Sequence, residues 1–309
     1  MSNWVWLSRV TLFGLVGTAI LATLFVSIRG LPETRNSNRL EATAVTPEEI
    51  QALEMSASQP PTPVTQQNSF LKFGGNTTVP TRSFDLQQSL NIYFRLFEAP
   101  TSLGMVAIGV AEGNYRLITK GGTLYVQQTS TYFGHTDPGN LSWGDVVTNY
   151  GPCSDQGRSK GNIAVAEQWC LERARYALPT QLTDLSTAGI DPDLDLEAVL
   201  NAADLYNQAR PIHSRHFPKA LAIARRGGLT GIEALAWART ASFYLNINNE
   251  LDVERGANQA TGLIGICARE YRPITEWQCV YEDQMRRVNA IASVVEKYRL
   301  FAQQGAKNQ

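Results

Sequence analysis

The sequence has 309 residues and a formal net charge of −1, from 27 Lys and Arg against 28 Asp and Glu. No stretch concentrates basic residues among aromatic ones, so the composition argues against a nucleic-acid partner. P-loop, dinucleotide-binding, Gly-x-Ser-x-Gly and zincin motifs are all missing from the sequence, which excludes the protein classes that those motifs define.

An uncharged apolar run over residues 10–28 is the first feature in chain order, and as a helix it is long enough to cross a hydrocarbon core. Arg9 and Arg29 bracket the run. A cleaved signal peptide is the alternative, but the next small-x-small triplet, at residues 42–44, lies too far downstream for a cleavage site. We therefore expect residues 1–30 to form an uncleaved signal anchor whose apolar run spans the lipid bilayer.

Four cysteines indicate the compartment of the remaining chain. Cys153 with Cys170 and Cys267 with Cys279 form two locally spaced pairs, without the spacings typical of zinc sites. Two disulfides would each stabilise the fold by roughly 3 kcal/mol and persist only in an oxidising compartment, whereas four reduced, buried cysteines are the alternative. Arginines are more frequent after the apolar run than before it, which by the positive-inside rule points the domain inward. We favour the disulfides, and expect a single-pass protein of the plasma (inner) membrane with most of its chain extracytoplasmic or periplasmic.

Residues 31–81 differ in composition from both neighbours. Thr, Ser, Pro, Gln and Asn dominate there, and large apolar side chains are few. Such a segment cannot build a core and predicts a flexible linker, which as a chain of about 50 residues would span on the order of 40 Å. Residues 82–309 are long enough for one large domain or two closely packed lobes.

Periodic apolar positions predict that this domain is mainly helical. The expected helices lie near residues 85–98, from about 101, near 162–176, after 193, from 230, and after a break at Pro273. Residues 113–152 are instead rich in Gly, Thr, Asn and Tyr and predict loops and short strands, the clearest at residues 125–129. We therefore expect a mainly α protein of the α+β type: a helical domain with a small irregular β-rich insert, plus one N-terminal transmembrane helix.

Glu112 is the most informative single residue, because it ends an apolar helix directly before Gly113, a natural helix stop. A carboxyl group at this place would be partly desolvated. Desolvation favours the neutral form that a general acid needs if it is to protonate a glycosidic oxygen. The alternative is a carboxylate that only caps the helix or forms an ion pair at its end.

Three motifs follow one another around this residue: Ala111-Glu112-Gly113, then Gly121-Gly122 shortly before Tyr125, then Tyr-Phe-Gly-His-Thr-Asp-Pro-Gly at residues 132–139. Over about 30 residues this order resembles the lysozyme-like superfamily, and within it the lambda-type phage endolysins, which are lytic transglycosylases. The resemblance implies that residues 82–309 form a lysozyme-like domain that cleaves the glycan strands of peptidoglycan. We expect no cofactor.

The resemblance also implies roles for particular residues. In a lytic transglycosylase Glu112 acts alone, first as acid and then as base, whereas a hydrolytic muramidase usually adds a second carboxylate. Asp137 is the nearby candidate, although Asp before Pro-Gly is ordinary turn chemistry, so we prefer the single-carboxylate mechanism. The expected substrate-binding residues are Tyr132, His135, Asp137, Asn140, Trp143, Tyr206 and Gln208.

Two further readings remain open. In a helix His213 and His216 would share one face and could bind a metal together with His135, but no third ligand is fixed by spacing, and we expect no metal site. A non-catalytic envelope protein, which binds peptidoglycan or a protein partner, is the alternative to an enzyme. Glu112 distinguishes the two, because only the enzyme requires it.

Overall fold

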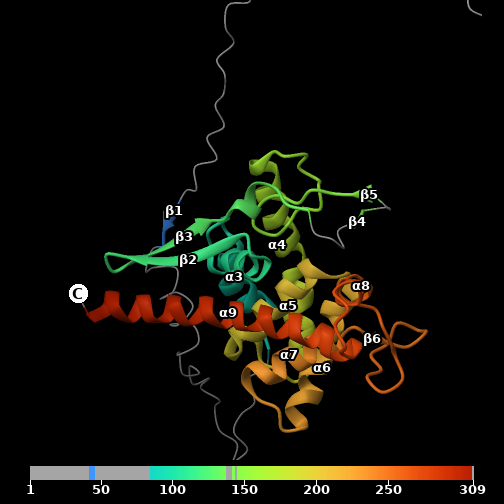
Figure 1. Ribbon diagram of the computed structural model, residues 1–309. Coiled ribbons are helices and arrows are strands. Elements are labelled where there is room, and N and C mark those ends of the chain that lie inside the picture. The colour runs from blue at the N-terminus through green and yellow to red at the C-terminus, as the bar shows by residue number, and fades with distance from the viewer. Residues whose placement is uncertain (1–41, 46–83, 137–140, 143–144, 308–309) are drawn as a thin grey trace, which may run out of the picture. The chain divides into compact units, whose positions relative to one another are not determined.

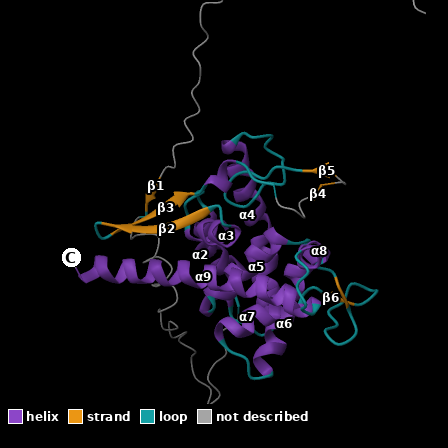
Figure 2. Cartoon of the chain, viewed as in Figure 1, coloured by secondary structure: helices purple, strands orange, loops and turns teal. Residues whose placement is uncertain are grey.

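The computed structural model describes residues 42–45, 84–136, 141–142 and 145–307, and within these ranges the chain is mainly helical, as expected. The helices are α2 (Leu86–Tyr93), α3 (Leu103–Glu112), α4 (Ile163–Thr187), α5 (Leu196–Gln208), α6 (Pro211–Arg226), α7 (Gly231–Ala241), α8 (Thr261–Arg269) and α9 (Glu276–Lys307). The strands are β1 (Ala42–Ala44), β2 (Tyr115–Lys120), β3 (Thr123–Gln128), β4 (Leu141–Ser142), β5 (Asp145–Val146), β6 (Tyr244–Leu245) and β7 (Ala257–Asn258). Figure 2 shows how small the strands are beside the helices.

Within the described ranges, no helix combines the length and the apolar character that a membrane crossing needs. The apolar run over residues 10–28, which we expect to be the transmembrane helix, lies outside the described residues.

Helix α3 is central to the domain. Its side chains Met105, Val106 and Ile108 are buried, and α5 and α9 both pack against it. Figure 1 shows α9 extending past α3, α5 and α7, each of which it contacts. Because α3 ends at Glu112, this packing brings the carboxyl group of that residue between α5 and α9.

Strands β2 and β3 form a hairpin directly after α3. Their two-residue turn, Gly121-Gly122, has φ values of +58° and +78°, which glycine adopts without strain and which a tight hairpin turn requires. Tyr115, at the start of β2, packs against α3 at Gly109, where an added Cβ would lie 2.3 Å from the tyrosine ring. The expected strand near residues 125–129 is confirmed as the second half of β3.

Strand β1 lies inside the segment expected to be a linker. It pairs antiparallel with β3, with Ala44 opposite Tyr125, and gives the strand order β1-β3-β2. Val45 is buried in the core and its backbone N–H donates to Leu124 at 2.9 Å. The prediction of a continuous linker over residues 31–81 is therefore wrong at residues 42–45, and its other residues lie outside the described ranges.

The helices predicted from apolar periodicity are present, and several differ from the prediction at their ends. The helix expected near residues 85–98 is α2 followed by a 3-10 turn, Phe94–Phe97, and the one expected near 162–176 continues as α4 through Pro179. The break at Pro273 is confirmed, since α9 begins at Glu276. Helix α6, which apolar periodicity does not predict, begins with Pro211 in its first turn, where proline leaves no backbone donor unpaired.

Candidate functional site

Glu112 faces a cavity of about 520 Å³ at the C-terminal end of α3. Gly113, with φ of +81°, ends the helix in the left-handed conformation that glycine favours. Arg286 of α9 donates to the carbonyl of Ala111 at 2.9 Å and so satisfies one of the last acceptors of the helix. The end of α3, and with it Glu112, is thus fixed from both sides.

Two kinds of side chain line the cavity. The polar lining consists of Glu112, Asn149, Ser154, Gln156, Asn207, Gln208, Arg210, His213, Gln259, Thr261, Asp283, Arg286 and Arg287. The apolar lining comes from Phe243 and Ala260 and, on α8, from Leu263 and Ile266. A cavity of this size, with amides and charged groups opposite an apolar wall, suits a small polar ligand or part of a polymer.

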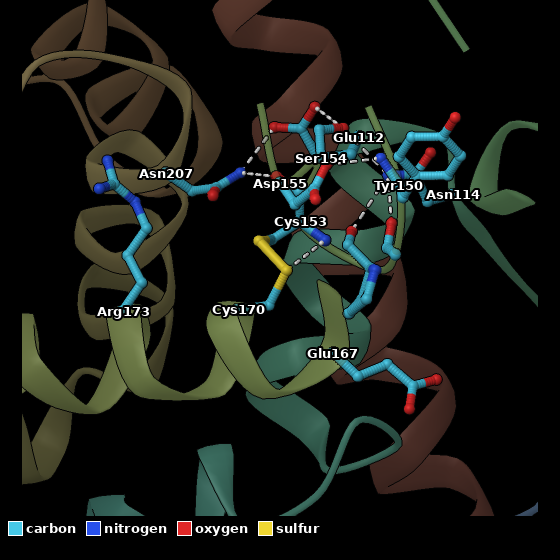
Figure 3. The surroundings of a disulfide bond; sticks show 12 residues. Glu112, Asn114, Tyr150, Cys153, Ser154, Asp155, Glu167, Cys170, Arg173 and Asn207 are labelled. Atoms are coloured by element: carbon cyan, nitrogen blue, oxygen red, sulfur yellow. Dashed lines mark hydrogen bonds between the residues drawn. A yellow bond between two sulfur atoms is a disulfide. The ribbon is translucent and has the colours of Figure 1, made fainter. Parts of the chain in front are cut away.

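The two carboxylate oxygens of Glu112 have different surroundings. Its Oε1 accepts from Asn207 Nδ2 and from Arg287 Nη1, each at 3.0 Å. Among the described residues, its Oε2 accepts one long hydrogen bond, from Ser154 Oγ at 3.4 Å. Figure 3 shows Asn207 and Ser154 on either side of the carboxyl group. With the Glu112 side chain only 10% exposed, Oε2 is the oxygen left for a ligand in the cavity.

The loop that carries Ser154 is held in shape by Asp155. The Asp155 carboxylate accepts from the backbone N–H groups of Tyr150, Gly157 and Ser159, at 2.9, 3.1 and 2.6 Å. Ser154 itself has φ of +61°, a conformation that costs a non-glycine residue free energy. The loop therefore holds Ser154 beside Glu112 against the backbone preference of serine.

A disulfide and an asparagine attach the same loop to its neighbours. Cys153 is bonded to Cys170 of α4, with the two Cα atoms 5.7 Å apart (Figure 3). Asn114 Nδ2 lies within hydrogen-bond distance of Gly151 O at 3.0 Å and Ser154 Oγ at 3.1 Å. The second disulfide joins Cys267 of α8 to Cys279 of α9. Both predicted disulfides are confirmed.

Arg287 connects Glu112 to a buried ionic network, which consists of Glu112, Asp204, Asp283, Arg239 and Arg287. Arg287 lies 3.1 Å from Asp204 and 3.6 Å from Asp283, in addition to its pair with Glu112. Burial alone would lower the pKa of Arg287, but the three carboxylates outweigh burial and raise that pKa above its ordinary value. Arg287 therefore remains a cation beside the cavity.

Asp283 is the second carboxylate that lines the cavity, and its oxygens accept hydrogen bonds from neighbouring side chains. It accepts from Gln208 at 2.8 Å, Gln284 at 3.1 Å and Arg286 at 2.8 Å. Burial would raise the pKa of Asp283, but the charges of Arg287 and Arg286 outweigh burial and hold the pKa below its ordinary value. Asp283 therefore stays ionised as an acceptor for its neighbours.

His213 is a neutral imidazole in the wall of the cavity. Its Nδ1 lies 2.9 Å from the carbonyl of Ser242, which can only accept, so Nδ1 carries the hydrogen. Its ring stacks against Phe243 with 4.6 Å between centroids. Burial is the main cause that lowers the pKa of His213 below its ordinary value. In the described part of the chain, no group of three His, Cys, Asp or Glu residues could hold a metal ion.

The structure places the expected substrate-binding residues in different surroundings. Gln208 lines the cavity, but its side chain is bonded to Asp283 and Arg239. Tyr132 is fully buried, donates to Glu167 and stacks on Tyr115, so its expected place in a sugar cleft is wrong. The sequence around a tyrosine in a Gly-rich segment does not distinguish a place in a sugar cleft from a place in the core. Here the ring completes the core under the hairpin.

Within the described residues, the lining of the cavity includes neither His135 nor Tyr206. The backbone of His135 pairs with Asn149, and its ring Nδ1 lies 2.8 Å from the carbonyl of Thr131. Tyr206 packs against Arg173, whose guanidinium carbon lies 4.5 Å from the centroid of the tyrosine ring. The expected ligands Asp137, Asn140 and Trp143 lie outside the described residues.

Arg287, Asp283 and Ser154 were missed by sequence reasoning. Asp283 and Arg287 are four residues apart on α9, a spacing that favours an ion pair, and this was the one signal that could have singled them out. The contact between Arg287 and Glu112 joins residues that are 175 apart in the sequence, so it has no local signature.

Comparisons with protein-family models, with curated proteins and with solved structures each find no match for this chain.

Proposed function

We propose that the protein is a membrane-anchored enzyme that cleaves the glycan strands of peptidoglycan, with Glu112 as its single general acid and base. The observation that carries this proposal is the asymmetry of the Glu112 carboxyl group. Oε1 is fixed by Asn207 and Arg287, whereas within the described residues Oε2 accepts one long hydrogen bond, from Ser154, beside the cavity that Glu112 lines. A general acid needs this combination of a fixed orientation and an oxygen that is only weakly bonded.

The proposed reaction is that of a lytic transglycosylase. Glu112 Oε2 gives a proton to the glycosidic oxygen as the bond from that oxygen to the anomeric carbon breaks. A hydroxyl group of the same sugar forms the new bond to the anomeric carbon, and its proton passes to Glu112, which is thereby restored. No water enters the balance, so one carboxyl group is sufficient.

The ionic network fixes the position of the carboxyl group for this cycle. Arg287 lies 3.0 Å from Glu112 and, together with Asn207, orients its Oε1. Arg287 is itself held by Asp204 at 3.1 Å and Asp283 at 3.6 Å, so its place beside Glu112 is defined by three carboxylates.

The proposed location follows from the disulfides and the apolar run. Both disulfides are of the kind that persists in an oxidising compartment, and the run over residues 10–28 is long enough for a bilayer anchor. An extracytoplasmic domain tethered to the plasma membrane would meet peptidoglycan directly.

A non-catalytic protein that binds peptidoglycan or a protein partner is the second candidate. The observation that favours it is that every oxygen of Glu112 already has a hydrogen-bond donor, as in a structural carboxylate. In that case the cavity binds a glycan unit and no bond is cleaved.

Zymography of the full chain in mild detergent, on gels that contain peptidoglycan, separates the two candidates. We expect clearing by the wild type and none by Glu112→Gln, with anhydro-sugar ends on the released fragments in mass spectrometry. Glu296→Gln, on an exposed position of α9, is the matched control and should clear like the wild type. Clearing by Glu112→Gln, or none by the folded wild type, would overturn the enzymatic proposal. Reducing ends would instead assign the protein to the hydrolases.

A further inference from the structure

Four side chains form a continuous stack beside the cavity: Arg158, Trp169, Arg173 and Tyr206. The guanidinium carbon of Arg158 lies 4.6 Å from the centroid of the Trp169 ring. Arg173 lies 5.3 Å from the same ring and 4.5 Å from the ring of Tyr206. We call these four residues the arginine–aromatic stack. Arg158 is exposed and the other three are partly exposed, so solvent and ligands can reach the stack.

The two arginines of the stack differ from the ion-paired arginines of the domain. Arg215 and Arg225 each form an ion pair with an aspartate. Within the described ranges, Arg158 and Arg173 have no carboxylate within ion-pair distance, and their hydrogen bonds go to neutral acceptors. Burial is the main cause that lowers the pKa of Arg173, and the nearby charge of Arg158 adds to it. Two uncompensated positive charges held close together favour the approach of an anion.

Both ends of the stack are linked to residues that line the cavity. Arg158 Nη1 donates to the side chain of Gln156 at 2.6 Å, and Gln156 lines the cavity. At the other end Tyr206 directly precedes Asn207, which holds Glu112. Figure 3 shows Arg173 rising from α4 toward Asn207. The stack and the cavity are thus neighbours through Gln156 and Asn207, and a chain-like ligand that occupies both would have to pass these two residues.

We propose that the arginine–aromatic stack binds an oxyanion on a glycan strand whose neighbouring sugar lies at Glu112. The guanidinium groups of Arg158 and Arg173 would pair with a carboxylate or phosphate group, and Trp169 and Tyr206 would contact the apolar part of the sugar. This inference rests on the proposed function and adds a selection: the site prefers acidic glycans over neutral ones of the same backbone.

Binding to matched glycans tests the proposal without any need for cleavage. The probes are glycol chitin, which is neutral, and carboxymethyl chitin, which carries carboxylates on the same backbone. Phosphorylated chitin is a third probe that separates carboxylate from phosphate recognition. The protein is the full chain in mild detergent with Glu112→Gln, so that the glycans stay intact. We expect binding to carboxymethyl chitin to be about tenfold tighter than to glycol chitin, and to weaken as salt is raised.

Variants assign that preference to the stack. Arg158→Gln should weaken binding to carboxymethyl chitin about three- to tenfold and leave glycol chitin unchanged, because only the charged contact is lost. Arg226→Gln is the control, since it removes an exposed charge at the end of α6. Equal affinity of the parent for the two glycans, or an equal loss in Arg226→Gln, would overturn the proposal. Equal binding of phosphorylated chitin would support an oxyanion site of broader selectivity.

The two proposals can fail separately. If the full chain never clears peptidoglycan yet binds carboxymethyl chitin through Arg158, the proposed cleavage fails and the oxyanion site stands. If it clears peptidoglycan and shows no preference for acidic glycans, the oxyanion site fails and the proposed cleavage stands.

Discussion

The guanidinium of Arg239 lies 2.6 Å from the carboxylate of Asp204, and neither side chain is exposed to solvent. Asp204 also binds Arg287, which in turn holds Glu112 at the cavity. The ion pair in the core and the candidate acid at the surface are therefore parts of one network. Removal of one buried partner leaves a charge without compensation, and this costs far more than the loss of an exposed pair.

We expect Asp204→Asn to lower the free energy of unfolding by about 3 to 5 kcal/mol, because two buried guanidinium groups lose their shared carboxylate. Urea denaturation of the full chain measures the change. Asp184→Asn is the control, since it breaks a pair with the largely exposed Arg215 and should cost at most about 1 kcal/mol. Similar losses in the two variants would contradict a structural role for the network.

His213 should make the stability of the domain depend on pH. Burial lowers its pKa in the folded state below the ordinary value of 6.5, so the unfolded chain takes up this proton more readily. The free energy of unfolding is therefore expected to fall as pH drops below about 6.5, and the contribution of His213 should be constant above that value. Denaturation at a series of pH values measures it.

The matched variants for this pH dependence are His213→Gln and His216→Gln. His213→Gln should flatten the decrease in stability below pH 6.5, because it removes the buried group that must be protonated. Burial is the main cause of the lowered pKa of His213 and the charge of His216 is a lesser one, so replacement of His216, whose Nε2 lies 2.7 Å from the carbonyl of Asn249, should leave most of the decrease in place. The assignment would be refuted by an unchanged pH profile in the His213 variant.

The disulfide between Cys153 and Cys170 should matter for both stability and activity. Replacement of both cysteines by alanine frees a loop of 17 residues and should cost about 3 kcal/mol. It should also slow peptidoglycan clearing, because Ser154 next to Cys153 would no longer be held beside Glu112. Replacement of Cys267 and Cys279 is the comparison, because this disulfide joins α8 to α9 and does not attach the loop that carries Ser154, so its loss should affect stability more than clearing. Unchanged clearing by the folded Cys153 and Cys170 variant would contradict the positioning role.

Local patterns in the sequence predicted the features that depend on near neighbours. The apolar helix that ends at Glu112, the break at Pro273 and the two disulfides are all of this kind, because spacing along the chain is enough to define them. Strand β1 escaped prediction because Ala-Thr-Ala has little preference for a strand and its partner lies far along the chain.

Side-chain direction was the harder part of the candidate site. Tyr132 and Glu112 both flank the Gly-rich segment, yet one completes the core and the other reaches the cavity. Only the packing of α9 and α5 against α3 decides which side chain meets Arg287 and Asn207. A short window of sequence cannot predict contacts between helices that lie so far apart in the chain.

The position of β1 has a consequence for the order of folding. Ala44 pairs with Tyr125, 81 residues further along the chain (125 − 44), whereas β2 and β3 are joined by two glycines. Closing the longer loop costs roughly 3 kcal/mol more in chain entropy, so the hairpin is expected to form before β1 docks on it. The first described strand to be synthesised would then be among the last to reach its native place.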